Sequence, residues 1–404
     1  MCDWVNVYET GECMKSKVLS MLLVIVLLFS CSINVYGYDL KEKPDCRAAI
    51  IMEQDSGKVL YEYNSNEKLP MASVTKLMTY YVFMKYAKEE GMDFEQTVRV
   101  STAGWNLSPY ASAIGLKDGE SLTISQLIQG TLIVSANDFA TALRDVYELN
   151  GGNMVEEMNR KAQEMGLTAT SFINVTGLTA DDGRDTNYSS ARDLAVLCKA
   201  VIDEFPETLE ITSRRSFDYK GKTFATTNRL LIADSGVDGM KTGHTEAAGY
   251  CLVSTKMLQP AQDNYGKHRV ITVVLGCKSE EGRVQESAKL LKYAEEAFAN
   301  ERVASAADAF TSENPFYKAG TIAASTNQDV YVLHNVDDSL QVKTEFKSKL
   351  TKNITKGDEI GTLVVTNSNG EETKFPLYAA DDYKTVNIFK KLILHVRNFF
   401  IRLF

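Results

Sequence analysis

Ser73 and Lys76 lie three residues apart, just before an apolar run that extends from Leu77 to Met84. Positions i and i+3 share one face of a helix, so this hydroxyl and this amine can touch. A helix that is apolar on all sides is a buried one, and its N-terminus favours a developing negative charge. A serine hydroxyl becomes a useful nucleophile only when a neighbouring base takes its proton. The pair therefore predicts a serine nucleophile that is activated by an amine.

Two further groups of residues could complete a site around this pair. Ser135 and Asn137 stand between two predicted helices, where their side chains can point into a cleft. Lys241, Thr242 and Gly243 stand at the predicted start of a strand. A glycine in a strand allows another backbone to approach closely, and we expect that backbone to belong to a substrate.

The residue types suggest a role for each side chain of the first two groups. No histidine is placed to act as the base of a Ser-His-Asp triad. Lys76 is the candidate general base, provided that burial and the nearby cation Lys241 lower its pKa. Ser135 can relay a proton to a leaving amine, and Asn137 can hydrogen-bond a substrate amide.

The third group offers the means to bind an acyl substrate. Lys241 and Thr242 can hold a carboxylate, because one is a cation and the other a hydroxyl donor. The backbone N–H groups of Ser73 and His244 can form an oxyanion hole, which stabilises the charge that develops during acyl transfer. Together with Gly243, these residues are the predicted substrate-binding part of the site.

Strands at both ends of the first 305 residues enclose a group of helices, and this pattern predicts an α+β domain with an antiparallel sheet and a helical layer. Residues 47–52 and 59–63 read as a hairpin, and residues 269–277 as a central strand. The predicted helices cover residues 122–133, 139–147, 153–165, 190–202 and 284–298. We expect this domain to span residues 38–305.

The remainder of the chain reads as two smaller parts. Residues 306–382 alternate short strands with turns, which predicts a small all-β domain. Residues 383–404 carry five Lys or Arg and no acid, whereas residues 38–382 carry 37 basic and 50 acidic residues. Aromatic and aliphatic side chains recur there at helical spacing. A basic amphipathic helix of this kind lies in a membrane surface, so Tyr383–Phe404 is the predicted membrane anchor; packing on the protein's own core is the alternative.

The N-terminus reads as a targeting segment. A basic start at Met14, which we take as the true start of translation, precedes an apolar run to Phe29 that is too short to span a bilayer. Small residues before Tyr38 predict cleavage after Gly37, so residues 1–37 are the signal region. Lipidation at Cys31 is the alternative. With either, the mature chain is exported, and we expect it at the outer face of the cytoplasmic membrane or in the cell wall.

Composition excludes several classes of function. The net charge of −9 argues against a nucleic-acid-binding protein. Four histidines are scattered along the chain, and the cysteine spacings match no zinc pattern, so we expect neither a metal nor another cofactor. Export leaves four cysteines, Cys46, Cys198, Cys251 and Cys277, which we expect to be buried free thiols, with one disulfide as the alternative.

The order Ser-x-x-Lys, Ser-x-Asn, Lys-Thr-Gly resembles that of penicillin-binding proteins and class A β-lactamases. The segments around these motifs, Met71–Thr79 and Val237–Tyr250, together with Asn174–Leu178 and Tyr188–Leu194, are similar to those of the D-alanyl-D-alanine carboxypeptidases. These are the low-molecular-mass penicillin-binding proteins of the S11 serine peptidase family. The resemblance covers residues 46–298, and the β domain and tail resemble that family's second domain and anchor.

This resemblance implies a serine peptidase that removes the terminal D-alanine from peptidoglycan pentapeptide stems through an acyl-serine, and that is slowly acylated by β-lactams. Two departures fall in the long loop near the cleft. Asn187 stands where the family usually has His, and Val175 where it often has Pro. We expect them to affect the substrate preference rather than the chemistry.

Two other functions remain open at this point. A serine β-lactamase would need a general base, usually a Glu, in the loop ahead of the Lys-Thr-Gly strand; the loop offers Asp181, Asp182 and Asp185 but no Glu. A non-catalytic, penicillin-binding wall sensor would not need Ser73 and Lys76, and both are present.

Overall fold

The computed structural model describes residues 43–103, 105, 112–149, 151–179, 186–234, 236–260, 264–348, 350 and 352–401 of the 404-residue chain. The predicted signal region with Cys31 lies outside the described residues, as do Asp181, Asp182 and Asp185.

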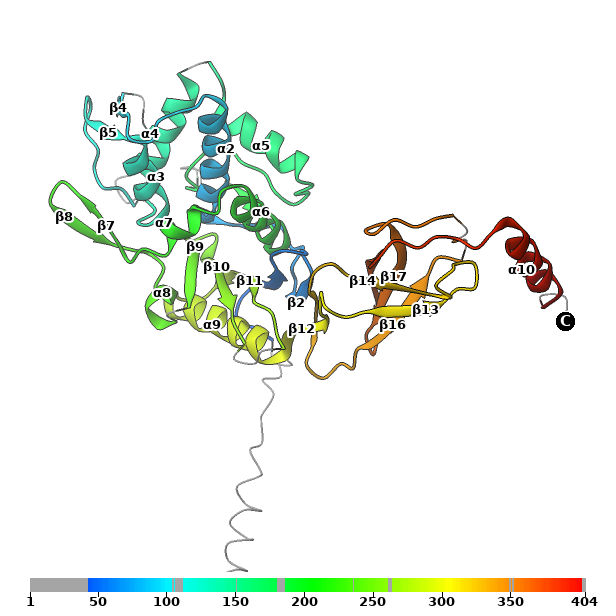
Figure 1. The fold of residues 1–404 in the computed structure, drawn as a ribbon. Coiled ribbons are helices and arrows are strands. Elements are labelled where there is room, and N and C mark those ends of the chain that lie inside the picture. The colour runs from blue at the N-terminus through cyan, green and yellow to red at the C-terminus, as the bar shows by residue number, and fades with distance from the viewer. Residues whose placement is uncertain are drawn as a thin grey trace, which may run out of the picture. The chain divides into compact units, whose positions relative to one another are not determined.

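A five-stranded antiparallel sheet forms the centre of the first domain (Figure 1). The predicted N-terminal hairpin supplies two of its strands, and the C-terminal part of the domain supplies the other three, as expected. In spatial order the strands are β2 (Val59–Tyr63), β1 (Ala48–Glu53), β11 (His268–Cys277), β10 (Gly249–Leu258) and β9 (Val237–Thr245). β9 lies at one edge of this sheet.

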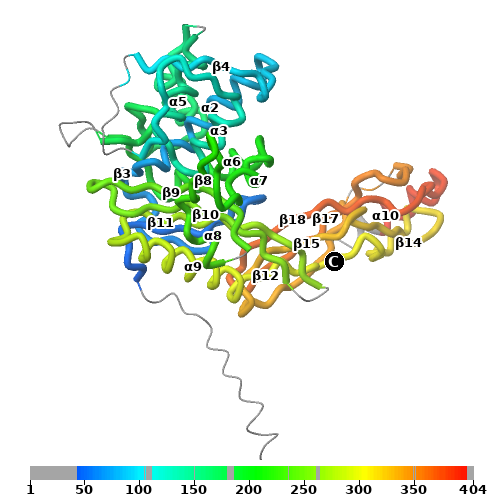
Figure 2. The backbone as a smooth tube through the Cα atoms, turned by 90° about the vertical axis from the view of Figure 1, so that its left-hand side faces the viewer, coloured from blue at the N-terminus to red at the C-terminus, as the bar shows by residue number. Residues whose placement is uncertain are grey.

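Both faces of the sheet are covered, because successive side chains of a strand point to opposite faces. Ile50 packs in one hydrophobic cluster and its neighbour Ile51 in another. The second cluster lies under α9 (Glu280–Ala297), which runs along the sheet in both views (Figures 1 and 2). The sequence predicted this helix to begin at Val284, but Ser279 caps it by accepting a hydrogen bond from Gly282 N at 2.9 Å.

The other face carries the helical layer, which is built around α2 (Lys76–Glu89). Every residue of α2 from Lys76 to Met84 is buried, which confirms the expectation from its apolar sequence. The surrounding helices are α3 (Ile124–Leu132), α4 (Asn137–Glu148), α5 (Met154–Glu164) and α6 (Ala191–Glu204). Ser190 caps α6 by accepting a hydrogen bond from Asp193 N at 3.0 Å.

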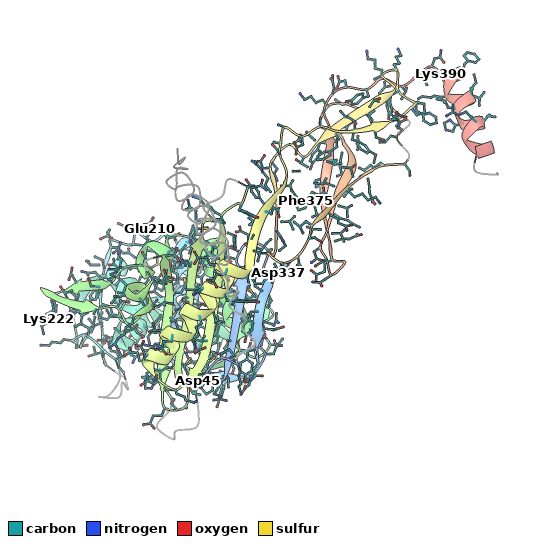
Figure 3. All side chains as sticks on the ribbon, turned by 90° about the horizontal axis from the view of Figure 1, so that it is seen from below. Asp45, Glu210, Lys222, Asp337, Phe375 and Lys390 are labelled. Atoms are coloured by element: carbon teal, nitrogen blue, oxygen red, sulfur yellow. The ribbon has the colours of Figure 1, made fainter. Side chains whose placement is uncertain are left out.

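Short elements connect these layers. Two of them matter for the site: the 3₁₀ turn η1 (Ala72–Thr75), which leads into α2, and the short pair of β3 (Leu69–Pro70) with β6 (Tyr188–Ser189) beside it. The others are β4 (Thr97–Arg99), β5 (Ser121–Thr123), α7 (Thr208–Thr212), β7 (Ser216–Tyr219), β8 (Lys222–Ala225) and α8 (Leu230–Ala233). Lys222 lies at the tip of the β7–β8 hairpin (Figure 3).

The C-terminal part is all β, as predicted, and ends in one helix. β12 (Phe298–Ala304) pairs with β15 (Val330–Asn335). A five-stranded sheet has the order β13 (Phe310–Glu313), β14 (Thr321–Ser325), β18 (Glu372–Ala379), β17 (Glu359–Thr366) and β16 (Gln341–Phe346). Phe375 of β18 and Lys390 of the terminal helix α10 (Ile388–Ile401) are labelled in Figure 3.

The four cysteines within the described residues are buried and free, as expected. None of the helices in the described part of the chain is long and apolar enough to cross a membrane.

Candidate active site

The predicted nucleophile, Ser73, lies in the 3₁₀ turn η1 and not in the first turn of the α-helix itself. Ala72, the residue before it, has a φ of +49°, a left-handed conformation that is costly for a residue with a side chain. This conformation lets the chain turn sharply before Lys76 begins α2. Lys76 Nζ lies 2.9 Å from Ser73 Oγ, so the structure brings the predicted pair together.

Lys76 has three hydrogen-bond acceptors around its amine. Besides Ser73 Oγ, these are Asn137 Oδ1 at 2.7 Å and the backbone oxygen of Thr176 at 2.9 Å. The side chain is fully buried, and burial lowers the pKa of Lys76 to about 7, while the negative charge of Asp138 opposes this shift. At neutral pH a large fraction of Lys76 is therefore an unprotonated amine, the form that can act as a base.

Ser135 and Asn137 lie in the turn that joins α3 to α4. Ser135 has a φ of +62° and is 5% exposed, which makes it the second residue of the site that is held in a left-handed conformation. Such conformations persist where the surrounding structure imposes them, often at active sites. Asn137 begins α4 and accepts a hydrogen bond from Lys76, so this residue of the Ser-x-Asn group reaches the first pair.

Lys241, Thr242, Gly243 and His244 lie within the edge strand β9. The sequence placed them at the start of a strand, and this was wrong, because β9 begins four residues earlier at Val237. The Lys241 side chain is buried, and its pKa is well below the usual value because of burial and the neighbouring cation Lys76. The sequence predicted that Lys241 would help to lower the pKa of Lys76, but burial is the cause of that shift; the repulsion lowers the pKa of Lys241 instead.

The reason for Gly243 differs from the predicted one. A Cβ atom at this position would lie 2.6 Å from Met71 O and 3.1 Å from Ser73 N. The backbone that approaches Gly243 is therefore the turn that carries Ser73. His244, the next residue, is exposed, and its ring stacks on Tyr250 with 3.9 Å between the ring centroids.

Comparison with known proteins identifies the family of this chain. A family model described as D-alanyl-D-alanine carboxypeptidase, of peptidase family S11, matches residues 39–279. The chain belongs to the S11 D-alanyl-D-alanine carboxypeptidase family. A second model, described as the C-terminal domain of penicillin-binding protein 5, matches residues 298–385. The S11 resemblance that the sequence motifs carry is thereby confirmed.

Known S11 carboxypeptidases match over most of the chain. The chain is 31% identical over 395 residues to D-alanyl-D-alanine carboxypeptidase DacF of Bacillus subtilis, over 91% of this chain and 95% of the relative. Penicillin-binding protein 5 from Haemophilus influenzae has a TM-score of 0.68 at 27% identity, over 85% of this chain and 98% of that chain. The ampicillin-bound penicillin-binding protein D2 from Listeria monocytogenes has a TM-score of 0.54 at 30% identity, over 62% of this chain and 98% of that one.

Sequence reasoning missed two residues that hold the Lys-Thr-Gly strand of this S11 peptidase. Arg283 of α9 is buried and donates hydrogen bonds to the backbone oxygens of Gly243 at 3.1 Å and Thr227 at 3.4 Å. Thr227 in turn shares a hydrogen bond of 2.6 Å between its hydroxyl and that of Thr242. The available signal in the sequence was that Arg283 stands next to an apolar helix face. It was missed because the helix was predicted to begin at Val284, one residue later.

Asp138 was also missed, although it directly follows Asn137. Its carboxylate is buried and accepts hydrogen bonds from the backbone N–H groups of Ile114, Gly115 and Leu116 at 3.3, 2.7 and 3.0 Å. These bonds fix the segment before β5 on the start of α4. Asp138 is also the negative charge that opposes the lowered pKa of Lys76. The signal in the sequence was an acidic residue directly after Asn137.

No group of three or more His, Cys, Asp or Glu side chains that could hold a metal occurs among the residues that the structure describes. The side chains that the site offers for chemistry are a serine hydroxyl and two buried lysine amines. A buried amine with a lowered pKa beside a hydroxyl can activate that hydroxyl for attack on a carbonyl.

Proposed function

We propose that Ser73 is the nucleophile and Lys76 the general base of this S11 carboxypeptidase. The observation that carries the proposal is the position of the Lys76 amine, which contacts Ser73, Asn137 and the Thr176 carbonyl at once. Asn137 Oδ1 and the Thr176 oxygen each accept one N–H of the neutral amine, and its lone pair is then free to take the proton of the Ser73 hydroxyl. Asn137 is also placed to hydrogen-bond a substrate amide.

The substrate is a peptidoglycan stem peptide that ends in D-Ala-D-Ala. Ser73 Oγ attacks the carbonyl carbon of the penultimate D-alanine, and the backbone N–H groups of Ser73 and His244 receive the negative charge on its oxygen. Ser135 passes a proton to the leaving amine, and the terminal D-alanine departs. Lys241 and Thr242 bind its carboxylate. Water then hydrolyses the ester on Ser73 and releases the shortened peptide.

A β-lactam reacts at the same site. Ser73 Oγ opens the four-membered ring by attack on its carbonyl, and the amine formed stays attached to the acyl group. No part of the molecule departs, so the whole ring-opened molecule is attached to Ser73 as an ester until water hydrolyses that ester. We expect stoichiometric, slow-reversing acylation by penicillin, whereas a β-lactamase would turn the drug over rapidly.

The experiment is the release of free D-alanine from a peptide ending in Lys-D-Ala-D-Ala, measured for the purified protein and for Ser73→Ala. Release by the parent and none by the variant supports the assigned nucleophile. Equal release by both overturns it. Rapid hydrolysis of a chromogenic cephalosporin without D-alanine release would identify a β-lactamase instead.

The site of action is the outer face of the cytoplasmic membrane, where stem peptides are found. The signal region predicted from the sequence supports export, and α10 supports binding to the membrane surface. Its residues Ile388, Phe389, Leu392, Ile393 and Val396 are between 49 and 77% exposed and follow a helical spacing on one side. Leu394, on another side, is buried. An exposed apolar row on a basic helix is the surface that inserts among lipid headgroups.

A further inference from the structure

The side chain of Asn187 is fully buried and uses its whole hydrogen-bonding capacity. Its Nδ2 donates to Thr75 Oγ1 at 2.9 Å and to the backbone oxygen of Asn174 at 2.8 Å. Its Oδ1 accepts from the backbone N–H groups of Ile173 at 2.7 Å and Asn174 at 3.2 Å. An amide offers two donor hydrogens and one oxygen with two lone pairs, so all four positions are occupied. Asn187 thus joins the turn that carries Ser73 to the loop that begins at Ile173.

Asn174 is a second amide in the same loop. Its Oδ1 accepts from Thr176 N at 3.1 Å, from Thr176 Oγ1 at 3.2 Å and from Gly177 N at 2.7 Å. Its Nδ2 donates to the backbone oxygen of Leu178 at 2.9 Å. We call the side chains of Asn174 and Asn187 together the amide clamp. The clamp fixes the backbone turn from Asn174 to Leu178.

This turn lies directly on the nucleophile and base. The Thr176 oxygen accepts from Lys76 Nζ, and the Val175 oxygen accepts from Thr79 Oγ1 at 2.7 Å. Gly177 packs so closely that a Cβ atom there would lie 1.9 Å from Ala72 O. A displacement of the turn would therefore move the Thr176 carbonyl away from the amine of Lys76.

The position of the Thr176 carbonyl determines where the lone pair of the Lys76 amine points. A neutral lysine amine has two N–H groups and one lone pair. The Asn137 side chain and the Thr176 carbonyl can each accept one N–H, which leaves the lone pair to face Ser73 Oγ. If the Thr176 carbonyl moved, an N–H would be free to turn toward Ser73, and the amine could not take the serine proton.

We propose that the amide clamp is a positioning device for the general base: Asn187 and Asn174 hold the Thr176 carbonyl so that the lone pair of Lys76 points at Ser73. The proposal rests on the roles of Ser73 and Lys76 proposed above. It assigns Asn187 to the orientation of the base, whereas the sequence suggested an effect of this position on substrate preference. Because an amide carries no charge, the clamp holds Lys76 without favouring its protonated form.

The test is the rate of acylation by penicillin for Asn187→Ala and Asn187→Asp in the full chain, from pH 5 to 9. For Asn187→Ala we expect the first-order acylation step to slow by about 100-fold, the effect of misplacing a reacting group by about 1 Å. The dissociation constant of the non-covalent complex should stay within threefold. A loss confined to that constant, or a rate within threefold of the parent, overturns the proposal.

Asn187→Asp keeps the size of the side chain and supplies a readout that damage to the fold would not move. A carboxylate at this position favours the ammonium form of Lys76, in addition to Asp138 and against Lys241, so the pKa of Lys76 rises. The pH at which acylation reaches half of its maximum should move up by at least 0.5 unit, a half-unit change being about 0.7 kcal/mol. An unchanged midpoint overturns the proposal, and this variant decides the matter if Asn187→Ala fails to fold.

Asn159→Ala is the matched control. Asn159 also holds this loop by amide hydrogen bonds, because it donates to Phe172 O at 2.8 Å and accepts from Phe172 N at 2.9 Å; these bonds are made to a residue that precedes the clamp's turn and not to Thr176. We expect lower thermal stability and acylation within threefold of the parent. Ser73→Ala distinguishes a wrong nucleophile from a wrong role of the amide clamp. If Ser73→Ala is still acylated, the assigned nucleophile is wrong. If it is inert while Asn187→Ala reacts at the parental rate, only the clamp is wrong.

Discussion

At the scale of single residues, the site depends on how the surroundings of Lys76 set its proton affinity. Burial removes water from the amine and lowers its pKa to about 7. The buried carboxylate of Asp138 acts in the opposite sense, so the pKa of Lys76 is set by a balance between desolvation and one charge. The acceptors Asn137 and Thr176 then orient an amine that is already partly unprotonated at neutral pH.

The rate of acylation by penicillin should therefore follow the unprotonated fraction of Lys76. A group with a lowered pKa loses its proton as pH rises through that value, so the rate should rise with pH, reach half of its maximum near pH 7 and level off above pH 8. At pH 6 the rate should be about a tenth of the plateau. Stopped-flow acylation across this range measures it, and a flat profile from pH 5 to 9 would contradict the role of Lys76 as base.

Asp138→Asn should move this profile to lower pH. The variant removes the charge that raises the pKa of Lys76, so the amine form persists at lower pH. The useful measure is the ratio of rates at pH 6 and pH 9, because loss of the bonds to Ile114 and Leu116 lowers both rates together. Asp145→Asn, on the same helix but about one third exposed, is the control and should leave the ratio unchanged, since exposed charges are screened. A ratio that falls in Asp138→Asn would refute the argument.

At the scale of elements, the site is assembled by two backbone turns and one strand that contact one another. The turn around Ser73 is contacted by Gly243 of β9 from one side and by Gly177 of the 174–178 turn from another. Both glycines lack room for a side chain, and Gly177 also has a φ of +82°. The spacing between nucleophile, base and the Lys-Thr-Gly strand is therefore set by backbone contact.

Gly177→Ala should abolish acylation and destabilise the protein. The added Cβ, whose position is fixed by the backbone of residue 177, would lie 1.9 Å from the backbone oxygen of Ala72, so the turn must move. A left-handed alanine alone costs about 1–2 kcal/mol, and the clash adds to this. Gly166→Ala is a close control: its φ is +73°, but no atom lies within 4 Å of the added Cβ. It should lower the melting temperature by a few degrees and leave the acylation rate unchanged; equal effects of the two variants would show that the conformational cost alone matters.

Some of these elements could be predicted from the sequence and others could not, for physical reasons. The buried helix and the central strand are continuous apolar runs, and the hairpin consists of two strand-like segments; the structure confirms all three. The 3₁₀ turn at Ser73 has no such signal, because a left-handed Ala72 is imposed by neighbours that are distant in sequence. The Thr176 carbonyl and Asn187 could not be assigned, since a backbone oxygen leaves no mark in a motif and a buried amide reads as an ordinary loop residue. Arg283 was missed because it lies in the first turn of α9, and the predicted helix began one residue after it.

At the scale of the whole molecule, charge and apolar surface are unevenly distributed along the chain. Residues 38–382 have 37 basic and 50 acidic residues, whereas residues 383–404 have five basic residues and no acidic one. An anionic body with a cationic apolar tail favours contact with an anionic lipid surface through the tail alone. A catalytic domain bound in this way would remain at the membrane, where stem peptides are made available.

Removing two exposed apolar side chains of α10 should weaken this binding without changing the enzyme. Phe389 and Ile393 are 76 and 66% exposed, so Phe389→Ser with Ile393→Ser should leave the fold and D-alanine release intact. Full burial of each side chain in lipid contributes about 1.5–3 kcal/mol, so we expect the affinity for vesicles with anionic lipid to fall by about 100-fold or more. Vesicle sedimentation measures this affinity.

The control is Val342→Ser, which removes an exposed apolar residue of β16 and should bind like the parent. Binding of the parent should also weaken at high salt, because the basic residues contribute a screened attraction. If the double variant sediments as the parent does, the apolar row of α10 is not the surface that contacts lipid.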